Sequence, residues 1–284
     1  MCGNISEISF TVGSNPRPKS HVRFPEVKIL ETKFHKVTCQ DLIHYIVRAA
    51  QLSQKTTVAN VNVRAVNFTH SLPWYRRFIN TADLVFCDGF GVLWAGKLNG
   101  YRLQSVHRMT CPDYIEDLAK AFEQEKISLY LLAGKPGVVD KAIQQLKAVA
   151  PGLKIDGHHG YFSKEGKENT RIIEKINQFK PDVLYVGFGM PLQERWIINN
   201  FDKIDTRVFL PLGACLDFYT GSVQRGPQWL TDRGFEWLTR LVIEPHRLWS
   251  RYIIGNAVFF YRVFKERIRE DALKESRLRR STRR

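Results

Sequence analysis

Short runs of continuous apolar residues alternate along this chain with amphipathic stretches of helical spacing. The runs cover residues 56–62, 84–87, 128–133, 182–186 and 207–212, and helical patterns follow at residues 138–150 and 192–200. Strands that are apolar on both faces are typical of a parallel sheet that helices cover on each side. The alternation therefore predicts an α/β fold, with a mainly parallel sheet flanked by helices.

Polar residues and glycines follow these runs directly, and ligands of open α/β sheets bind beyond the carboxyl ends of the strands. Asp88 follows one run and precedes a glycine, so its carboxylate is placed to act as a general base or to hold a cation. Residues 187–193 place a glycine turn before a helix N-terminus, which suits a phosphate. A plain structural turn is the alternative interpretation of both segments. The other predicted strand ends carry Asn60, Asn62, Gly134 and residues 213–217.

Positive charge is concentrated toward the C-terminus. The chain has 43 Lys+Arg and 28 Asp+Glu, a net charge of +15, and residues 231–284 contain 14 basic but only 7 acidic residues. Aromatic and aliphatic residues from Leu248 to Phe264 recur among these arginines at roughly helical spacing. Such a helix suits an anionic membrane surface, where aromatics reach the headgroup level and arginines contact phosphates. A core-packing helix and RNA binding are the alternative interpretations.

The cysteines and histidines give no sign of a metal site. None of the cysteines forms a CxxC pair, so free buried thiols in a reducing cytoplasm are expected rather than disulfides. The sequence has no HExxH motif, and the adjacent His158 and His159 are expected on opposite sides of a strand. No bound metal is therefore expected. The five cysteines are Cys2, Cys39, Cys87, Cys111 and Cys215.

The hydropathy of the chain gives no sign of a membrane span or of a leader. No run of about 18 apolar residues occurs, so no transmembrane helix is expected. The first ten residues, MCGNISEISF, lack the basic and apolar regions of a signal peptide. Any contact with a membrane is therefore expected at its surface.

Several segments occur in the order and spacing of one known family. They are ADLVFCDGFGVLWAGK, RMTCPDY, LLAGKPGVV, GHHGYF, DVLYVGFGMPLQERWI, LGACLDFYTGSVQRGPQW and GFEWLTRLVIEPHRLWSRY. From about Lys28 to Tyr252, the chain resembles the WecG/TagA/CpsF glycosyltransferases (glycosyltransferase family 26). The resemblance implies a Rossmann-like sheet followed by a C-terminal helical membrane-binding appendage.

The resemblance also implies a reaction. Family members transfer a sugar from a UDP-sugar, with inversion and without a metal, onto a polyprenyl-diphosphate-linked sugar. The implied sugars are N-acetylmannosamine, its uronic acid or glucose, and the implied setting is capsule, exopolysaccharide or teichoic-acid assembly. The UDP-sugar is a co-substrate, and no cofactor is implied. The expected location is the bacterial cytoplasm, peripheral on the inner face of the plasma membrane.

Individual residues take roles by their match to the family pattern. The match implies that Asp88 is the catalytic base and that Arg108, Asn62 and Gln193 belong to the catalytic site. It implies that the uridine nucleotide is held by Tyr161, Gly187, Gly189 and Asp217. It implies that the acceptor diphosphate and the membrane are contacted by Arg240, Arg247 and Arg251. Guanidinium groups would then balance the charge of the leaving UDP.

Four positions depart from the family pattern. Asn60 stands where the family has threonine, and His107 where an acidic residue is common. Cys111 replaces the glycine of an RVTG-like segment, and Gly226 replaces the alanine of an RAP-like segment. These departures are expected to cluster around the acceptor and donor sugars, so they bear on the sugar identity.

The predicted organisation has three parts. Residues 1–25 form a flexible N-terminal segment, residues 26–235 the α/β catalytic glycosyltransferase domain, and residues 236–284 the basic amphipathic appendage. The alternatives are a basic nucleic-acid-binding protein and an NAD-dependent oxidoreductase. The latter needs a GxGxxG motif after an early strand, which the chain lacks. No nucleic-acid partner is expected, and a homo-oligomer is left open.

Overall fold

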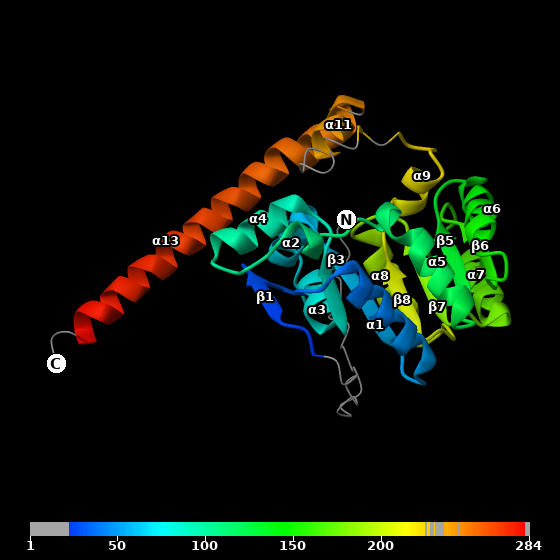
Figure 1. Ribbon diagram of the computed structural model, residues 1–284. Coiled ribbons are helices and arrows are strands. Elements are labelled where there is room, and N and C mark those ends of the chain that lie inside the picture. The colour runs from blue at the N-terminus through cyan, green and yellow to red at the C-terminus, as the bar shows by residue number, and fades with distance from the viewer. Residues whose placement is uncertain (1–22, 225, 228–229, 231–235, 244, 282–284) are drawn as a thin grey trace.

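The computed structural model describes residues 23–224, 226–227, 230, 236–243 and 245–281 (Figure 1). Most of the N-terminal segment that was predicted to be flexible lies outside these residues. So does the predicted boundary at residue 235. The three-part division of the chain therefore stays a prediction.

A six-stranded parallel sheet forms the centre of the molecule, as the apolar runs predict. Its strand order is β4-β3-β8-β7-β5-β6, and each neighbouring pair is parallel. The strands are β3 (Thr56–Val61), β4 (Leu84–Cys87), β5 (Leu129–Ala133), β6 (Ile155–His159), β7 (Val183–Gly187) and β8 (Val208–Pro211). β6 corresponds to no continuous apolar run, because only its first residue is buried. Its position at the edge of the sheet explains this polar composition.

Helices cover both faces of the sheet and create two hydrophobic cores. In β5, Leu131 belongs to one core and its neighbour Leu132 to the other, because successive strand residues point to opposite faces. The first core is closed by α1 (Cys39–Gln51), α5 (Ile115–Gln124), α6 (Val138–Val149) and α9 (Cys215–Tyr219). The second is closed by α2 (Val63–Ser71), α3 (Pro73–Thr81), α4 (Phe90–Leu98), α7 (Gly166–Phe179) and α8 (Leu192–Asn200).

An antiparallel hairpin precedes the parallel sheet. It consists of β1 (Glu26–Ile29) and β2 (Thr32–His35), with Val27 opposite Phe34. Both of these side chains are buried in the second core. Because buried and exposed residues alternate in these strands, no continuous apolar run marks them in the sequence.

The C-terminal region is helical and packs one face against the α/β body. It contains α11 (Glu236–Ile243), α12 (Pro245–Trp249), the π-helical turn η3 (Ser250–Ile254) and α13 (Gly255–Ser281). Phe259 and Val263 of α13 are buried in the second core. Asn67 of α2 donates to the Gly255 carbonyl at 2.8 Å and accepts from Arg262 at 3.1 Å. The predicted helical appendage is thus present, and its first turns also pack as core.

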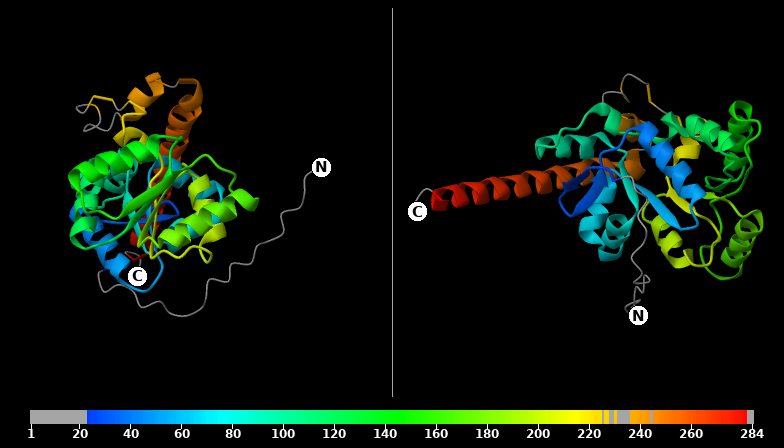
Figure 2. Two further views of the ribbon diagram at one scale, coloured as in Figure 1. Left: turned by 90° about the vertical axis from the view of Figure 1, so that its right-hand side faces the viewer. Right: turned by 60° about the horizontal axis from the view of Figure 1, so that its bottom comes forward.

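The rest of α13 extends beyond the body (Figure 2). Tyr261, Phe264 and Ile268 are exposed on it. Within the described part of the chain, no helix is both long and apolar enough to cross a membrane.

Candidate active site

A cavity of about 1760 Å³ opens beyond the carboxyl ends of the strands. One side, here called the sheet wall, is formed by residues at or beyond the carboxyl ends of the strands: Asn60, Asn62, Asp88, Arg108, Tyr161, Gly187, Gly189 and Asp217. The other side, here called the C-terminal wall, is formed by Arg251, Tyr252, Ile253, Asn256 and Phe260. A ligand site at this edge is the general expectation for open α/β sheets.

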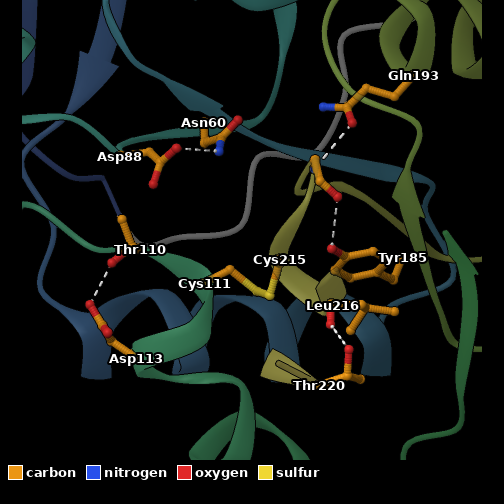
Figure 3. The surroundings of a disulfide bond; sticks show 11 residues. Asn60, Asp88, Thr110, Cys111, Asp113, Tyr185, Gln193, Cys215, Leu216 and Thr220 are labelled. Carbon is orange, nitrogen blue, oxygen red and sulfur yellow. Dashed lines mark hydrogen bonds between the residues drawn. A yellow bond between two sulfur atoms is a disulfide. The ribbon is translucent and has the colours of Figure 1, made fainter. Parts of the chain in front are cut away.

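Asp88 lies directly after β4, with two amides beside its carboxylate. Its backbone N–H donates to the Val61 carbonyl at 2.9 Å, which continues the pairing of β4 with β3. Its Oδ2 accepts from Asn60 Nδ2 at 3.2 Å (Figure 3). The same oxygen accepts from Asn62 Nδ2 at 3.4 Å. Both donors come from β3 or the residue after it, so the sheet register itself orients the carboxylate.

Asn62 is oriented by the helix that follows it. It is the N-cap of α2, and its Oδ1 accepts from the backbone N–H groups of Arg64 at 3.1 Å and Ala65 at 3.2 Å. With the oxygen committed to the cap, Nδ2 faces Asp88. A Cβ on Gly89 would lie 3.0 Å from the Asn62 Cβ, so the glycine after Asp88 lets the two segments approach.

Arg108 is brought beside Asp88 by a single β-bridge. Arg108 pairs with Cys87, and the Met109 N–H donates to the Cys87 carbonyl at 2.9 Å. The guanidinium carbon lies 4.3 Å from the centroid of the Phe90 ring. A cation stacked on an aromatic face retains its in-plane donors for a ligand. The structure thus places a carboxylate and a guanidinium together on the sheet wall of the cavity.

The residues predicted to hold a nucleotide also line the cavity. Gly187 ends β7, and a Cβ there would lie 2.5 Å from the Gly213 carbonyl oxygen. Gly189 has a φ of 84°, which favours glycine. Tyr161 is exposed after β6, and Asp217 lies in α9. Burial raises the pKa of the nearby Tyr185 phenol well above its usual value, and the Asp217 charge adds to this.

Gln193 does not line the cavity, unlike the other predicted catalytic residues. Its side chain is fully buried in α8, and its Oε1 accepts from the N–H groups of Gly189 and Gly213, each at 3.1 Å. Its Nε2 donates to Glu194 Oε1 at 2.8 Å. In this structure, Gln193 holds the two glycine turns from behind and does not face the cavity, so its predicted place in the catalytic site stays a prediction.

The three C-terminal arginines are described to different extents. Arg251 lines the cavity from η3, and its guanidinium lies 5.2 Å from the Tyr252 ring centroid. Arg240 is in α11 and Arg247 in α12, but their side chains lie outside the described part of the structure. Arg251 is therefore placed with Asp88 and Arg108 around one cavity, whereas the roles of Arg240 and Arg247 stay predictions.

Two of the five cysteines contradict the expectation of free thiols. Cys111 and Cys215 form a disulfide, with Cα atoms 5.6 Å apart, and both residues line the cavity (Figure 3). The reason is topological, because 104 residues separate them in sequence while the fold brings the segment after Arg108 to the start of α9. Cys39 and Cys87 are free, and burial raises the pKa of Cys87 to about 12. Cys2 lies outside the described residues.

The two adjacent histidines also differ from expectation. The rings of His158 and His159 lie 4.1 Å apart rather than on opposite sides of β6, because the strand ends at this point. Across the described residues, no three His, Cys, Asp or Glu side chains gather as metal ligands would.

The family follows from comparison with known proteins. The chain matches the model of the glycosyl transferase WecG/TagA/CpsF family over residues 27–273. The chain belongs to this family. It is therefore a glycosyltransferase, as its sequence segments indicate.

Curated relatives cover nearly the same length. A Staphylococcus aureus protein (strain COL) is 27% identical over 244 residues, which are 84% of this chain and 92% of the relative. A second S. aureus protein (strain MW2) is 26% identical over the same coverage. Both are named N-acetylglucosaminyldiphosphoundecaprenol N-acetyl-beta-D-mannosaminyltransferase.

The four departures from the family pattern do not all cluster at the cavity. Asn60 and Cys111 line it, whereas His107 is buried and accepts from the Gln104 N–H at 2.9 Å. Gly226 contacts α11, where a Cβ would lie 2.3 Å from Thr239 Oγ1. The structure thus places Asn60 and Cys111 in the cavity lining and leaves His107 and Gly226 outside it, and the link of the four departures to the sugar identity stays a prediction.

This family member has further cavity residues that its sequence motifs did not single out. Lys164 lines the cavity, donates to the carbonyls of Gly160 at 2.6 Å and Phe162 at 2.9 Å, and lies 4.1 Å from the Phe188 ring centroid. Burial lowers its pKa to about 8. Phe90 also lines the cavity, and its ring stacks against the Arg108 guanidinium. Phe90 lies inside the segment ADLVFCDGFGVLWAGK and Lys164 lies two residues after GHHGYF, but neither was singled out within them.

Proposed function

We propose that this protein transfers a sugar from a UDP-sugar, with inversion and without a metal, onto a polyprenyl-diphosphate-linked sugar. The observation that carries the proposal is the Asp88 carboxylate, held by two amides beside Arg108 in a large strand-end cavity. The relatives' names make N-acetylmannosamine the first donor sugar to test, with its uronic acid and glucose next. Their names likewise point to N-acetylglucosaminyl-diphosphoundecaprenol as the acceptor.

In the proposed reaction, Asp88 acts as the general base. It takes the proton of an acceptor hydroxyl while that oxygen forms a bond to the anomeric carbon of the donor. The bond from this carbon to the UDP oxygen breaks at the same time, and UDP leaves with the electron pair. In-line attack gives inversion of the anomeric centre. Arg108 and Arg251 line the same cavity, so they can offset the negative charge that develops on the diphosphate.

The nucleotide is proposed to lie along Gly187, Gly189, Tyr161 and Asp217. The backbone of the glycine turn can approach the ligand closely, because neither glycine carries a side chain. Arg240, Arg247 and the basic surface of α13 are proposed to meet lipid phosphates at the inner face of a bacterial plasma membrane. Capsule, exopolysaccharide and teichoic-acid assembly are the pathways in which such a reaction belongs.

A donor and acceptor screen tests the proposal. Purified protein is given UDP-N-acetylmannosamine, its uronic acid or UDP-glucose, with a short-chain polyprenyl-diphosphate N-acetylglucosamine and a chelator of divalent metals. We expect one donor to give a disaccharide product and free UDP. Asp156→Asn, which changes an exposed carboxylate of β6 outside the cavity, should leave the rate unchanged. No product from any donor, or product only with metal added, would contradict the proposal.

A further inference from the structure

We propose that α4 forms a second membrane-contacting surface beside α13, so that an anionic bilayer meets both sides of the cavity mouth. The proposal rests on the proposed function only in that the acceptor is a lipid. It assigns membrane contact to a helix of the α/β body, more than 130 residues before the appendage. The occupant to which it commits is the headgroup region of an anionic phospholipid bilayer.

Large apolar side chains of α4 and of the residues just after it are exposed in the described part of the structure. Trp94 is 53% exposed and Leu98 is 37% exposed, and Tyr101 just beyond the helix is 36% exposed. Exposed side chains of this size in one short segment mark a binding surface more often than an ordinary protein surface. Trp and Tyr also suit the boundary between headgroups and acyl chains, because their rings are apolar and carry one polar atom.

These side chains are continuous with the exposed side of α13. Helices α4 and α13 are in contact and lie side by side in Figure 1. Trp94 and Phe260 line the same cavity, and the Phe260 ring centroid lies 6.5 Å from that of Phe264. Phe264 is 49% exposed. Apolar groups from two distant parts of the sequence therefore border one cavity opening.

The charge around this surface matches an anionic bilayer. Residues 90–110 contain Lys97, Arg102 and Arg108 but no Asp or Glu. Residues 255–265 of α13 contain Arg262 and Lys265, again without an acidic residue. Basic residues around exposed aromatics are the combination by which peripheral proteins bind anionic membrane surfaces. A polyprenyl acceptor anchored in that bilayer would then enter the cavity between α4 and α13.

Vesicle binding without any substrate tests the proposal. The full chain is sedimented with vesicles of phosphatidylglycerol and phosphatidylethanolamine, and with vesicles of phosphatidylcholine alone. We expect Leu98→Ser to weaken binding to the anionic vesicles about tenfold, which corresponds to the loss of one buried leucine side chain. Lys97→Gln with Arg102→Gln should also weaken binding, most strongly at low salt. The matched control is Leu52→Ser, an exposed leucine next to the amino end of β3, which should bind as the unaltered protein does.

The outcomes separate this inference from the proposed function. If Leu98→Ser and the charge variant both bind anionic vesicles as tightly as the unaltered protein, α4 is not a membrane surface. If Leu98→Ser instead dissociates a dimer seen by light scattering, the surface binds a second copy of the chain, and the inference is wrong. Neither result concerns UDP binding or transfer to a soluble acceptor, which test the proposed function by themselves. Melting temperatures of the variants show whether each is folded.

Discussion

Asp88 and Arg251 line the same cavity, yet the two walls that carry them are fixed in different ways. The sheet wall is held by strand pairing, by the α2 cap and by the buried Gln193 side chain. The C-terminal wall is held to the body by Phe259, Val263 and the Asn67 hydrogen bonds. A firmly held wall suits a base that must meet one atom precisely. In the proposed function, the C-terminal wall is the side through which the lipid acceptor enters.

The sharpest test of this contrast compares the loss of a charged group from each wall. Asp88→Asn should lower turnover by about a thousandfold or more, because general base catalysis contributes on that order. UDP affinity, measured by calorimetry, should stay near that of the unaltered protein. Arg251→Gln should lower turnover far less, because Arg108 remains in the cavity. If Arg251→Gln lowers turnover more than Asp88→Asn, the chemistry does not reside in the sheet wall.

A second test weakens the attachment of the C-terminal wall without changing any residue of the sheet wall. Phe259→Ala removes a fully buried ring between α13 and the body, which costs about 3–5 kcal/mol in packed cores. Phe264→Ala, five residues later on the exposed side, should change the unfolding free energy by less than about 0.5 kcal/mol. Hydrogen exchange of α13 amides measures the difference directly. Equal protection in both variants would mean that the ring does not hold the helix.

The sequence predicted the sheet wall better than it predicted what supports that wall. Apolar runs predicted the buried strands, and polar residues at their ends predicted Asn62, Asp88 and Asp217, because strand periodicity and chain order are local properties. Gln193 was recognised in its motif, but its burial behind Gly189 and Gly213 depends on contacts between segments. The Cys111–Cys215 pair depends on the same kind of contact, across 104 residues. Such contacts leave no pattern in a single sequence.

The disulfide gives the sheet wall a covalent support that the C-terminal wall lacks among the described residues. It joins the segment after Arg108 to the helix of Asp217. Removing it with the double variant Cys111→Ala and Cys215→Ala should lower the unfolding free energy by about 2–4 kcal/mol, since a long loop is no longer closed in the unfolded chain. Urea denaturation with and without reductant measures this. A reductant that destabilises the double variant as much as the unaltered protein would show that the bond is not responsible.

The smallest expected effect concerns the layer directly behind the sheet wall. Burial raises the pKa of Glu194 from 4.5 to about 7, against the opposing hydrogen bond from Gln193. Between these two pH values the folded chain binds a proton that the unfolded chain releases, so the unfolding free energy falls as pH rises. The stabilising contribution of Glu194 is therefore fully present below about pH 4.5. The contribution is lost as pH rises through about 7, by at most about 3 kcal/mol. Glu194→Gln removes the titration while leaving an oxygen that can accept from Gln193. Its unfolding free energy should therefore fall less across this window than that of the unaltered protein. Equal slopes would mean that Glu194 stays ionised, and that the support of Gly189 and Gly213 through Gln193 does not depend on pH.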